Sequence, residues 1–111
     1  MGYLSYSADG RMQVIGTASG REAPHDTAPA DEVRVSLYDT MFAYAGTYAV
    51  EAGKVTHHVD ISWNEAWNGT DQVRFYEVNE NTLTITSRLS DPTSGAESRY
   101  DLVWERVATP R

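Results

Sequence analysis

The stretch that decides the fold runs from Lys54 to Tyr76 and reads KVTHHVDISWNEAWNGTDQVRFY. Both of its ends alternate between apolar and polar residues, with the period of two that is typical of β-strands. Its middle, the sequence WNEAW, breaks this alternation and predicts a loop or a short helical turn. Histidine, arginine, carboxylate and indole side chains are concentrated here. Together such side chains can line a pocket with apolar walls and a few selective polar groups.

Strand patterns continue on both sides of this stretch. Besides 54–62, we expect strands over residues 3–7, 11–17, 47–51, 71–78, 82–88 and 98–107. Loops are expected at 19–29 and 89–97, which are rich in Gly, Pro, Ser and Thr, and a frayed tail at 108–111. The chain of 111 residues is long enough for one core. Short antiparallel hairpins in series predict a single domain over 1–111, an all-β, up-and-down barrel with one inserted helix.

The inserted helix is expected at about residues 30–45. Asp31 and Glu32 suit the positive end of a helix dipole, and apolar residues then recur at helical spacing. Gly46 is the expected C-terminal stop. The apolar positions form an arc of about half the circumference at 100° per residue. We therefore expect this helix to bury a wide face.

Composition excludes several classes of function. The chain has no cysteine and a formal net charge of −7, and Lys54 is its only lysine, so neither disulfide chemistry nor nucleic-acid binding is expected. No apolar run is long enough to span a bilayer, and no secretory signal is visible, so the expected location is cytoplasmic. The sequence has no phosphate-binding loop, dinucleotide fingerprint or serine-hydrolase elbow. We expect no cofactor and no membrane partner.

Two adjacent histidines stand in the middle of the first strand of the decisive stretch. Residues next to each other on a strand point to opposite faces, so His57 and His58 cannot hold one metal ion, and no metal site is expected. His57 shares its row with Val55, Val59 and Ile61, the row assigned to the interior. Its imidazole there either satisfies a buried hydrogen bond or acts as an acid or base. If the faces are reversed, His58 and Asp60 become the interior pair.

Arg74 is the candidate anion-binding residue. It shares a strand face with Gln72 and Tyr76, opposite Val73 and Phe75. Inside a barrel, an arginine flanked by tyrosine would hold a carboxylate, enolate or phenolate. The candidate catalytic residues are His57, Arg74 and Tyr76.

Aromatic side chains supply the expected apolar wall of the pocket. Trp63 and Trp67 stand four residues apart, so one helical turn would place both indoles on the same side, where they could form a lid. Tyr44 and Tyr48 are expected at the same mouth. The candidate ligand-binding residues are Tyr44, Tyr48, His57, Trp63, Trp67, Arg74 and Trp104.

Several blocks resemble the bacterial and fungal lipocalin-like domain family. In chain order they are GYLSYSADGRM, AYAGTY, KVTHHVDISW, WNGTDQVRFYEV, LTIT and LVWERV. The resemblance implies a calycin-type antiparallel barrel with a small-molecule cavity, and some family members occur in secondary-metabolite pathways. Family members usually carry a further N-terminal strand of the type G-T-W-x-L ahead of the first block. Without it one sheet edge is exposed, so we expect closure by a second subunit, a homodimer.

Three functions are compatible with these patterns. The first is binding of a small apolar or aromatic, polyketide-like ligand. The second is a cofactor-free cyclase, isomerase or dehydratase, with His57 as acid or base and Arg74 or Tyr76 stabilising an oxyanion. The third is a protein with a packed interior that serves subunit interaction. Replacement of His57 by alanine separates the first two, because a binder keeps much of its affinity whereas an enzyme loses turnover.

Overall fold

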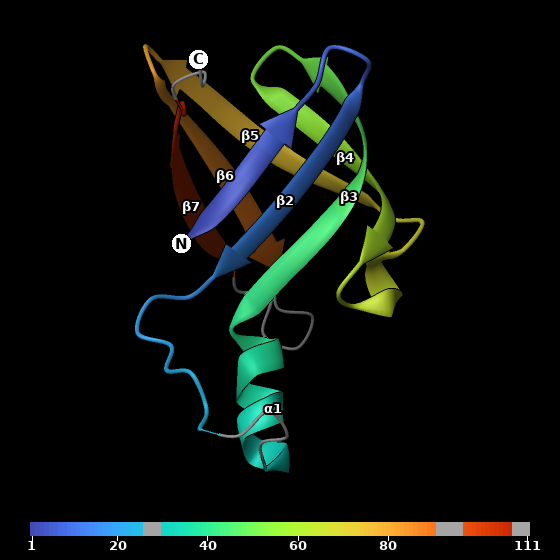
Figure 1. Ribbon diagram of the computed structural model, residues 1–111. Coiled ribbons are helices and arrows are strands. Elements are labelled where there is room, and N and C mark those ends of the chain that lie inside the picture. Colours follow the sequence, from blue (N-terminus) through green and yellow to red (C-terminus); the bar gives the residue numbers. More distant parts are fainter. Residues whose placement is uncertain (26–29, 91–96, 108–111) are drawn as a thin grey trace. The chain divides into compact units, whose positions relative to one another are not determined.

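The computed structural model describes residues 1–25, 30–90 and 97–107 (Figure 1). The predicted loops at 19–29 and 89–97 lie partly outside these residues, and the predicted tail at 108–111 lies wholly outside them. The elements follow one another as β1 (Gly2–Tyr6), β2 (Arg11–Thr17), α1 (Asp31–Asp39), β3 (Met41–Glu51), β4 (Lys54–Ser62), η1 (Glu65–Trp67), β5 (Asp71–Asn79), β6 (Thr82–Ser90) and β7 (Glu97–Glu105).

The seven strands form one sheet in which each strand is hydrogen-bonded to its neighbours in sequence, in the order β1-β2-β3-β4-β5-β6-β7. This is the up-and-down topology expected from the sequence, and the all-β class with one α-helix is confirmed. The chain divides into two compact units. Unit 1 comprises Met1–Thr47 and His58–Thr70, and unit 2 comprises Tyr48–His57 and Asp71–Arg111.

Unit 1 is built on the hairpin of β1 and β2 and on its pairing with β3. The predicted turn between the first two strands is held by the Ser7 hydroxyl, which donates to the Asp9 carboxylate at 2.5 Å, and by the amide of Gly10, which donates to the Ser7 carbonyl. Gly10 has φ 89°, a conformation that favours glycine. Along β2, Met12 and Val14 are buried while their sequence neighbours are exposed. The sheet in this unit therefore has one buried and one exposed face.

The helix is shorter than the sequence pattern predicted. It ends at Asp39, and the residues from Met41 to Ala45 belong to β3, where they pair with β2 from Thr17 to Gln13. Phe42 and Tyr44 favour strands, and the pairing with β2 outweighs the helical spacing. The expectation that Gly46 stops the helix is also wrong, since this residue lies within β3.

The expected burial of a wide helical face is wrong as well. No residue of α1 is buried, and Val35 and Tyr38 are exposed. Contacts with other segments hold its last turn: the Arg21 guanidinium donates to the carbonyl of Leu37 at 3.1 Å, and the ring centroids of Tyr38 and Trp63 lie 6.2 Å apart. In the described part of the chain, no helix combines the length and apolar composition needed to cross a membrane.

The predicted alternation along β4 holds for most of the strand and then breaks. Val55, His57 and Val59 are buried, as expected. Ile61, which was expected in the same row, is 64% exposed, and Asp60 before it is exposed too. Two successive exposed residues are what a β-bulge produces, because an extra residue reverses the alternation.

Glycine in β3 permits the close approach of β4 at this break. A Cβ on Gly46 would lie 1.8 Å from the carbonyl oxygen of His58 and 3.0 Å from the amide nitrogen of Asp60. Both neighbours are backbone atoms, so a side chain could fit only if the two strands moved apart. The position therefore accepts glycine alone.

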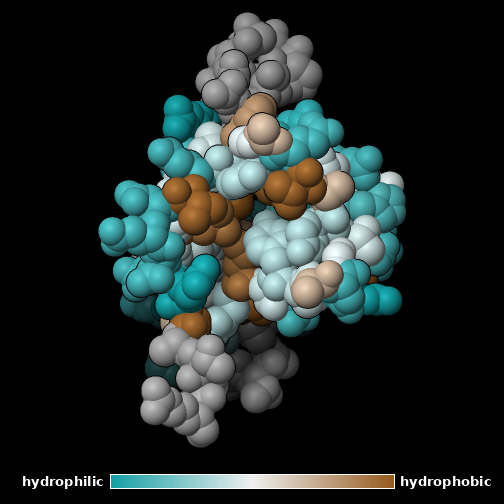
Figure 2. Space-filling view, turned by 90° about the horizontal axis from the view of Figure 1, so that it is seen from above, coloured by the Kyte–Doolittle hydropathy of each residue, from teal (hydrophilic) through white to brown (hydrophobic). Residues whose placement is uncertain are grey.

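Unit 2 contains the meander of β5, β6 and β7. Tyr76 pairs with Ile85, which pairs with Leu102, and Ile85 is buried. The opposite face carries polar contacts, including the Thr86 hydroxyl, which donates to the Asp101 carboxylate at 2.8 Å. This hydrogen bond, together with one from Arg99, lowers the pKa of Asp101. Large apolar side chains are also exposed, and Figure 2 shows apolar residues at the surface among hydrophilic ones.

Substitution of Gly46 by alanine should prevent folding or lower the free energy of unfolding by at least about 3 kcal/mol, because the added methyl group collides with backbone. Gly16→Ala is the matched control: its Cβ would meet only the far end of the Phe42 ring, at 2.5 Å, and that ring can turn away. We expect a cost of about 1 kcal/mol there. Urea denaturation of the two variants measures the difference, and equal losses would contradict the role given to Gly46.

Candidate functional site

His57 lies on β4 with only 2% of its surface exposed. Burial, and secondarily the positive charge of Arg74, lowers its pKa from 6.5 to about 4. The imidazole is therefore neutral at pH 7, with one nitrogen that can donate a hydrogen bond and one that can accept. His58, the next residue, is exposed and lies 3.9 Å from the carboxylate of Asp60. The expected division between the two histidines is thus observed.

Arg74 lies on β5 in a polar row that is less exposed than the apolar row behind it. Gln72, Arg74 and Tyr76 are all half-buried, whereas Val73 and Phe75 are exposed. The Arg74 guanidinium donates to the carbonyl of Val73 at 3.0 Å and to the side-chain oxygen of Gln72 at 3.4 Å. β5 therefore places this polar row on its less exposed face, a position that apolar residues usually occupy.

The register of β4 and β5 places these residues beside each other. The amide of Tyr76 donates to the carbonyl of Gly53 at 3.0 Å. Because residue numbers run in opposite directions along antiparallel strands, Arg74 then faces Val55, and Gln72 faces His57. Directly opposed residues point to the same side of the sheet. We refer to Val55, His57, Gln72 and Arg74 as the His57–Arg74 cluster, which lies entirely within unit 2.

The other candidates of unit 2 have simpler surroundings. The Tyr76 hydroxyl donates to the carbonyl of Glu51 at 3.3 Å, and so ties β5 to the turn between β3 and β4. Its proton is engaged in that contact. Tyr48 on β3 and Trp104 on β7 are both half-buried, and Trp104 pairs with Leu83.

The remaining three candidates come together in unit 1. Trp63 precedes η1 and Trp67 is its last residue; their ring centroids are 5.2 Å apart, while those of Tyr44 and Trp67 are 5.7 Å apart. Asn64 caps this helical turn, since its side-chain oxygen accepts a hydrogen bond from the amide of Ala66. The spacing of four residues does place the two indoles in contact, as the sequence predicted.

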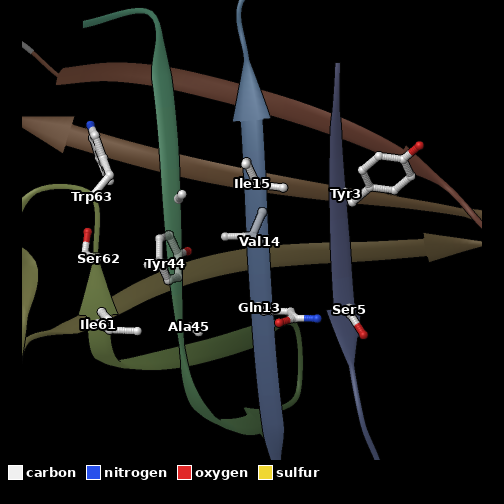
Figure 3. Close-up of a pocket in the computed structure, with 11 residues that line it drawn as sticks. Tyr3, Ser5, Gln13, Val14, Ile15, Tyr44, Ala45, Ile61, Ser62 and Trp63 are labelled. Carbon is white, nitrogen blue, oxygen red and sulfur yellow. The ribbon is translucent and has the colours of Figure 1, made fainter. Parts of the chain in front are cut away.

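A hollow of about 540 Å³ adjoins this aromatic group on the exposed face of unit 1 (Figure 3). Tyr44 and Trp63 contribute to it, but sequence reasoning missed the larger part of its lining, including Tyr3, Ile15 and Ile61. A signal was present: Ile15 interrupts the polar row of β2 with a large apolar side chain. Among the described residues, no three His, Asp or Glu side chains converge as a metal ion would require.

Stability should fall when the solution is acidified from pH 6.5 to pH 4. In this interval the unfolded chain binds a proton at residue 57 and the folded chain does not, so each step down in pH favours unfolding. The full effect of the lowered pKa is about 3 kcal/mol. Urea denaturation at several pH values measures it. His57→Gln should remove this part of the pH dependence while His58→Gln leaves it unchanged, and identical profiles for the two variants would contradict the assignment.

Comparison with known proteins agrees with this architecture. No curated protein matches the chain. The profile of the lipocalin-like domain family matches residues 1–107, which is nearly the whole sequence, and confirms the resemblance carried by the sequence blocks. The chain therefore belongs to the lipocalin-like domain family.

Proposed function

We propose that this protein binds a small, largely apolar or aromatic molecule, polyketide-like in size, that carries one acidic group. The lipocalin-like family is consistent with small-molecule binding in general. The observation that supports the finer proposal is the His57–Arg74 cluster, in which a buried neutral imidazole and a half-buried guanidinium share one face of β4 and β5.

Both groups stand in strand rows where apolar side chains would be the usual choice. A polar side chain loses solvation when it enters the core, and valine or leucine in its place would avoid that loss. Arg74 occupies the less exposed row although Val73 and Phe75 stand beside it in the sequence. A carboxylate, enolate or phenolate of a ligand would accept charge-assisted hydrogen bonds from the guanidinium.

Unit 2 also has apolar and aromatic side chains, Val55 of the cluster among them, that suit an apolar ligand body. Ile85 and Val55 are buried, and Tyr48 and Trp104 are half-buried in the same unit. Apolar and aromatic walls give a ligand most of its affinity, while one or two polar groups fix its orientation. Arg74 would hold the acidic group, and the neutral imidazole of His57 would add a single hydrogen bond.

The lowered pKa of His57 favours binding over the alternative of acid–base catalysis. A general base works best when its pKa lies near the pH of the reaction, and a pKa of about 4 makes a weak base at pH 7. The Tyr76 hydroxyl, the other candidate, donates to the carbonyl of Glu51. The role in secondary metabolism, the homodimer and the cytoplasmic location stay predictions.

Arg74→Gln should weaken the binding of an aromatic acid by about tenfold or more, the amount expected for a lost charge-assisted hydrogen bond. The probes are 2-naphthoic acid and the uncharged 2-naphthalenemethanol, compared by titration calorimetry. We expect the acid to bind more tightly than the alcohol to the unmodified protein, and the variant to bind both equally.

Arg106→Gln serves as the control, because Arg106 is exposed and lies outside the cluster. It should keep the preference for the acid. Equal affinity of the unmodified protein for the two probes, or an undiminished preference in Arg74→Gln, would refute the proposal. In the complex, the ligand's negative charge should raise the pKa of His57, which an NMR titration of the imidazole resolves.

A further inference from the structure

The exposed face of unit 1 carries two adjoining hollows. The first, of about 540 Å³, is lined by Tyr3, Ile15, Ala43 and Trp63 among others. The second, of about 440 Å³, includes Ser7, Arg11 and Asp60. They share Ser5, Gln13, Ala45 and Ile61, so they form one continuous groove along the sheet. Each volume lies within the range of small-molecule sites in proteins.

The strand registers explain why the groove changes character along its length. Tyr3 pairs with Ile15, Ile15 with Ala43, and the amide of Trp63 donates to the carbonyl of Ala43 at 2.8 Å. These residues make an apolar row across four segments of chain. Figure 3 shows Tyr3 and Trp63 at opposite sides of the hollow, with Ile15 between them.

The next row is mixed. Ser5 pairs with Gln13, and Gln13 with Ala45, beside which Ile61 adds an exposed apolar side chain. The small side chains of Ala43 and Ala45 form a low floor of the groove between the larger side chains on either side. The break in alternation along β4 matters here, because it is what turns Ile61 outward.

The two ends of the groove differ in the charge of the side chains that line them. Among the described residues lining the first hollow, none is charged, although the chain as a whole carries −7. The second hollow holds one cation and one anion: Arg11, which lies 3.7 Å from Asp9, and Asp60, which lies 3.9 Å from His58. An anionic head group would meet the carboxylate of Asp60, and a cationic one the guanidinium of Arg11. Hydroxyl groups, which both donate and accept, suit such a pair.

We propose that this groove is a second ligand site, which takes an uncharged amphipathic molecule of the glycoside kind. The apolar body lies along Tyr3, Ile15 and Trp63, and the hydroxyl-rich head lies against Ser7, Arg11 and Asp60. The site is independent of the His57–Arg74 cluster, which is lined by other residues and selects an acid.

The probe is octyl β-glucoside below its micellar concentration, followed by methyl NMR, with octyl sulfate as the chain-matched anion. We expect the glucoside to shift the methyl signals of Ile15, Ala43 and Ile61 and to leave those of Val55 and Ile85 in place. Octyl sulfate should bind about tenfold more weakly, because its head has no hydroxyl group to donate to the Asp60 carboxylate.

Ala45→Trp fills the groove where its two halves meet and should weaken glucoside binding by about tenfold or more. Ala49→Trp is the matched control, because Ala49 is exposed on the same strand and lines neither hollow. It should leave the affinity unchanged. If Ala45→Trp does not fold, Ile61→Ser, which only shortens an exposed side chain, should still weaken binding by about threefold.

Absence of binding, unchanged affinity in these groove variants, or shifts confined to Val55 and Ile85 would overturn the inference. The last result would place the glucoside at the cluster and leave the proposed acid site intact. Conversely, glucoside binding in the groove together with failure of the naphthoic acid experiment would refute the proposed function alone.

Discussion

In unit 1 the backbone of β3 at Gly46 lies very close to the backbone of β4 from His58 to Asp60, and this close approach constrains both strands. Where a Cβ would stand on Gly46, the structure has a peptide carbonyl. No side chain can be accommodated without separating the strands. The alternation along β4 breaks at the same place, so that Val59 is fully buried while Ile61 is exposed two residues later. The exposure of Ile61 depends on this local reversal.

Alternation along a strand also gives adjacent residues of the same type different surroundings. His57 and His58 differ by one position: the first is buried and has its pKa lowered, and the second is exposed. On β5 the alternation of faces places Arg74 in the less exposed row and Phe75 in the more exposed one. This is the reverse of the arrangement that their hydrophobicity predicts. Natural sequences depart from the simple pattern mainly where function requires it. Such a departure is therefore informative about the site.

Much of the fold could be predicted from the sequence, because hairpins are encoded locally. Turn residues such as Asp9 and Gly10, and the alternation on both sides of them, fix strands within a residue or two. The helix end could not be predicted this way: the segment after Asp39 has helical spacing, and its pairing with neighbouring strands, β2 among them, makes it a strand.

Part of the candidate site could likewise be predicted from the sequence. The burial of His57 and the contact between the two indoles follow from spacing along a single segment. The groove does not, since Tyr3, Ile15 and Trp63 become neighbours only through the register of several strands. The exposure of Ile61 also escaped prediction, because a bulge depends on the partner strand as well as on the residues that contain it.

The shortness of α1 affects the dynamics of the molecule. With nine residues and no buried side chain, α1 is below the length at which an isolated helix persists in water, about 12 residues. Figure 1 shows it leading into the start of β3, and the Arg21 contact to Leu37 and the ring contact of Tyr38 with Trp63 are tertiary support for its last turn. Its amide hydrogens should therefore exchange through a local opening while the strands stay paired. Limited proteolysis should cut in this segment before it cuts in the strands.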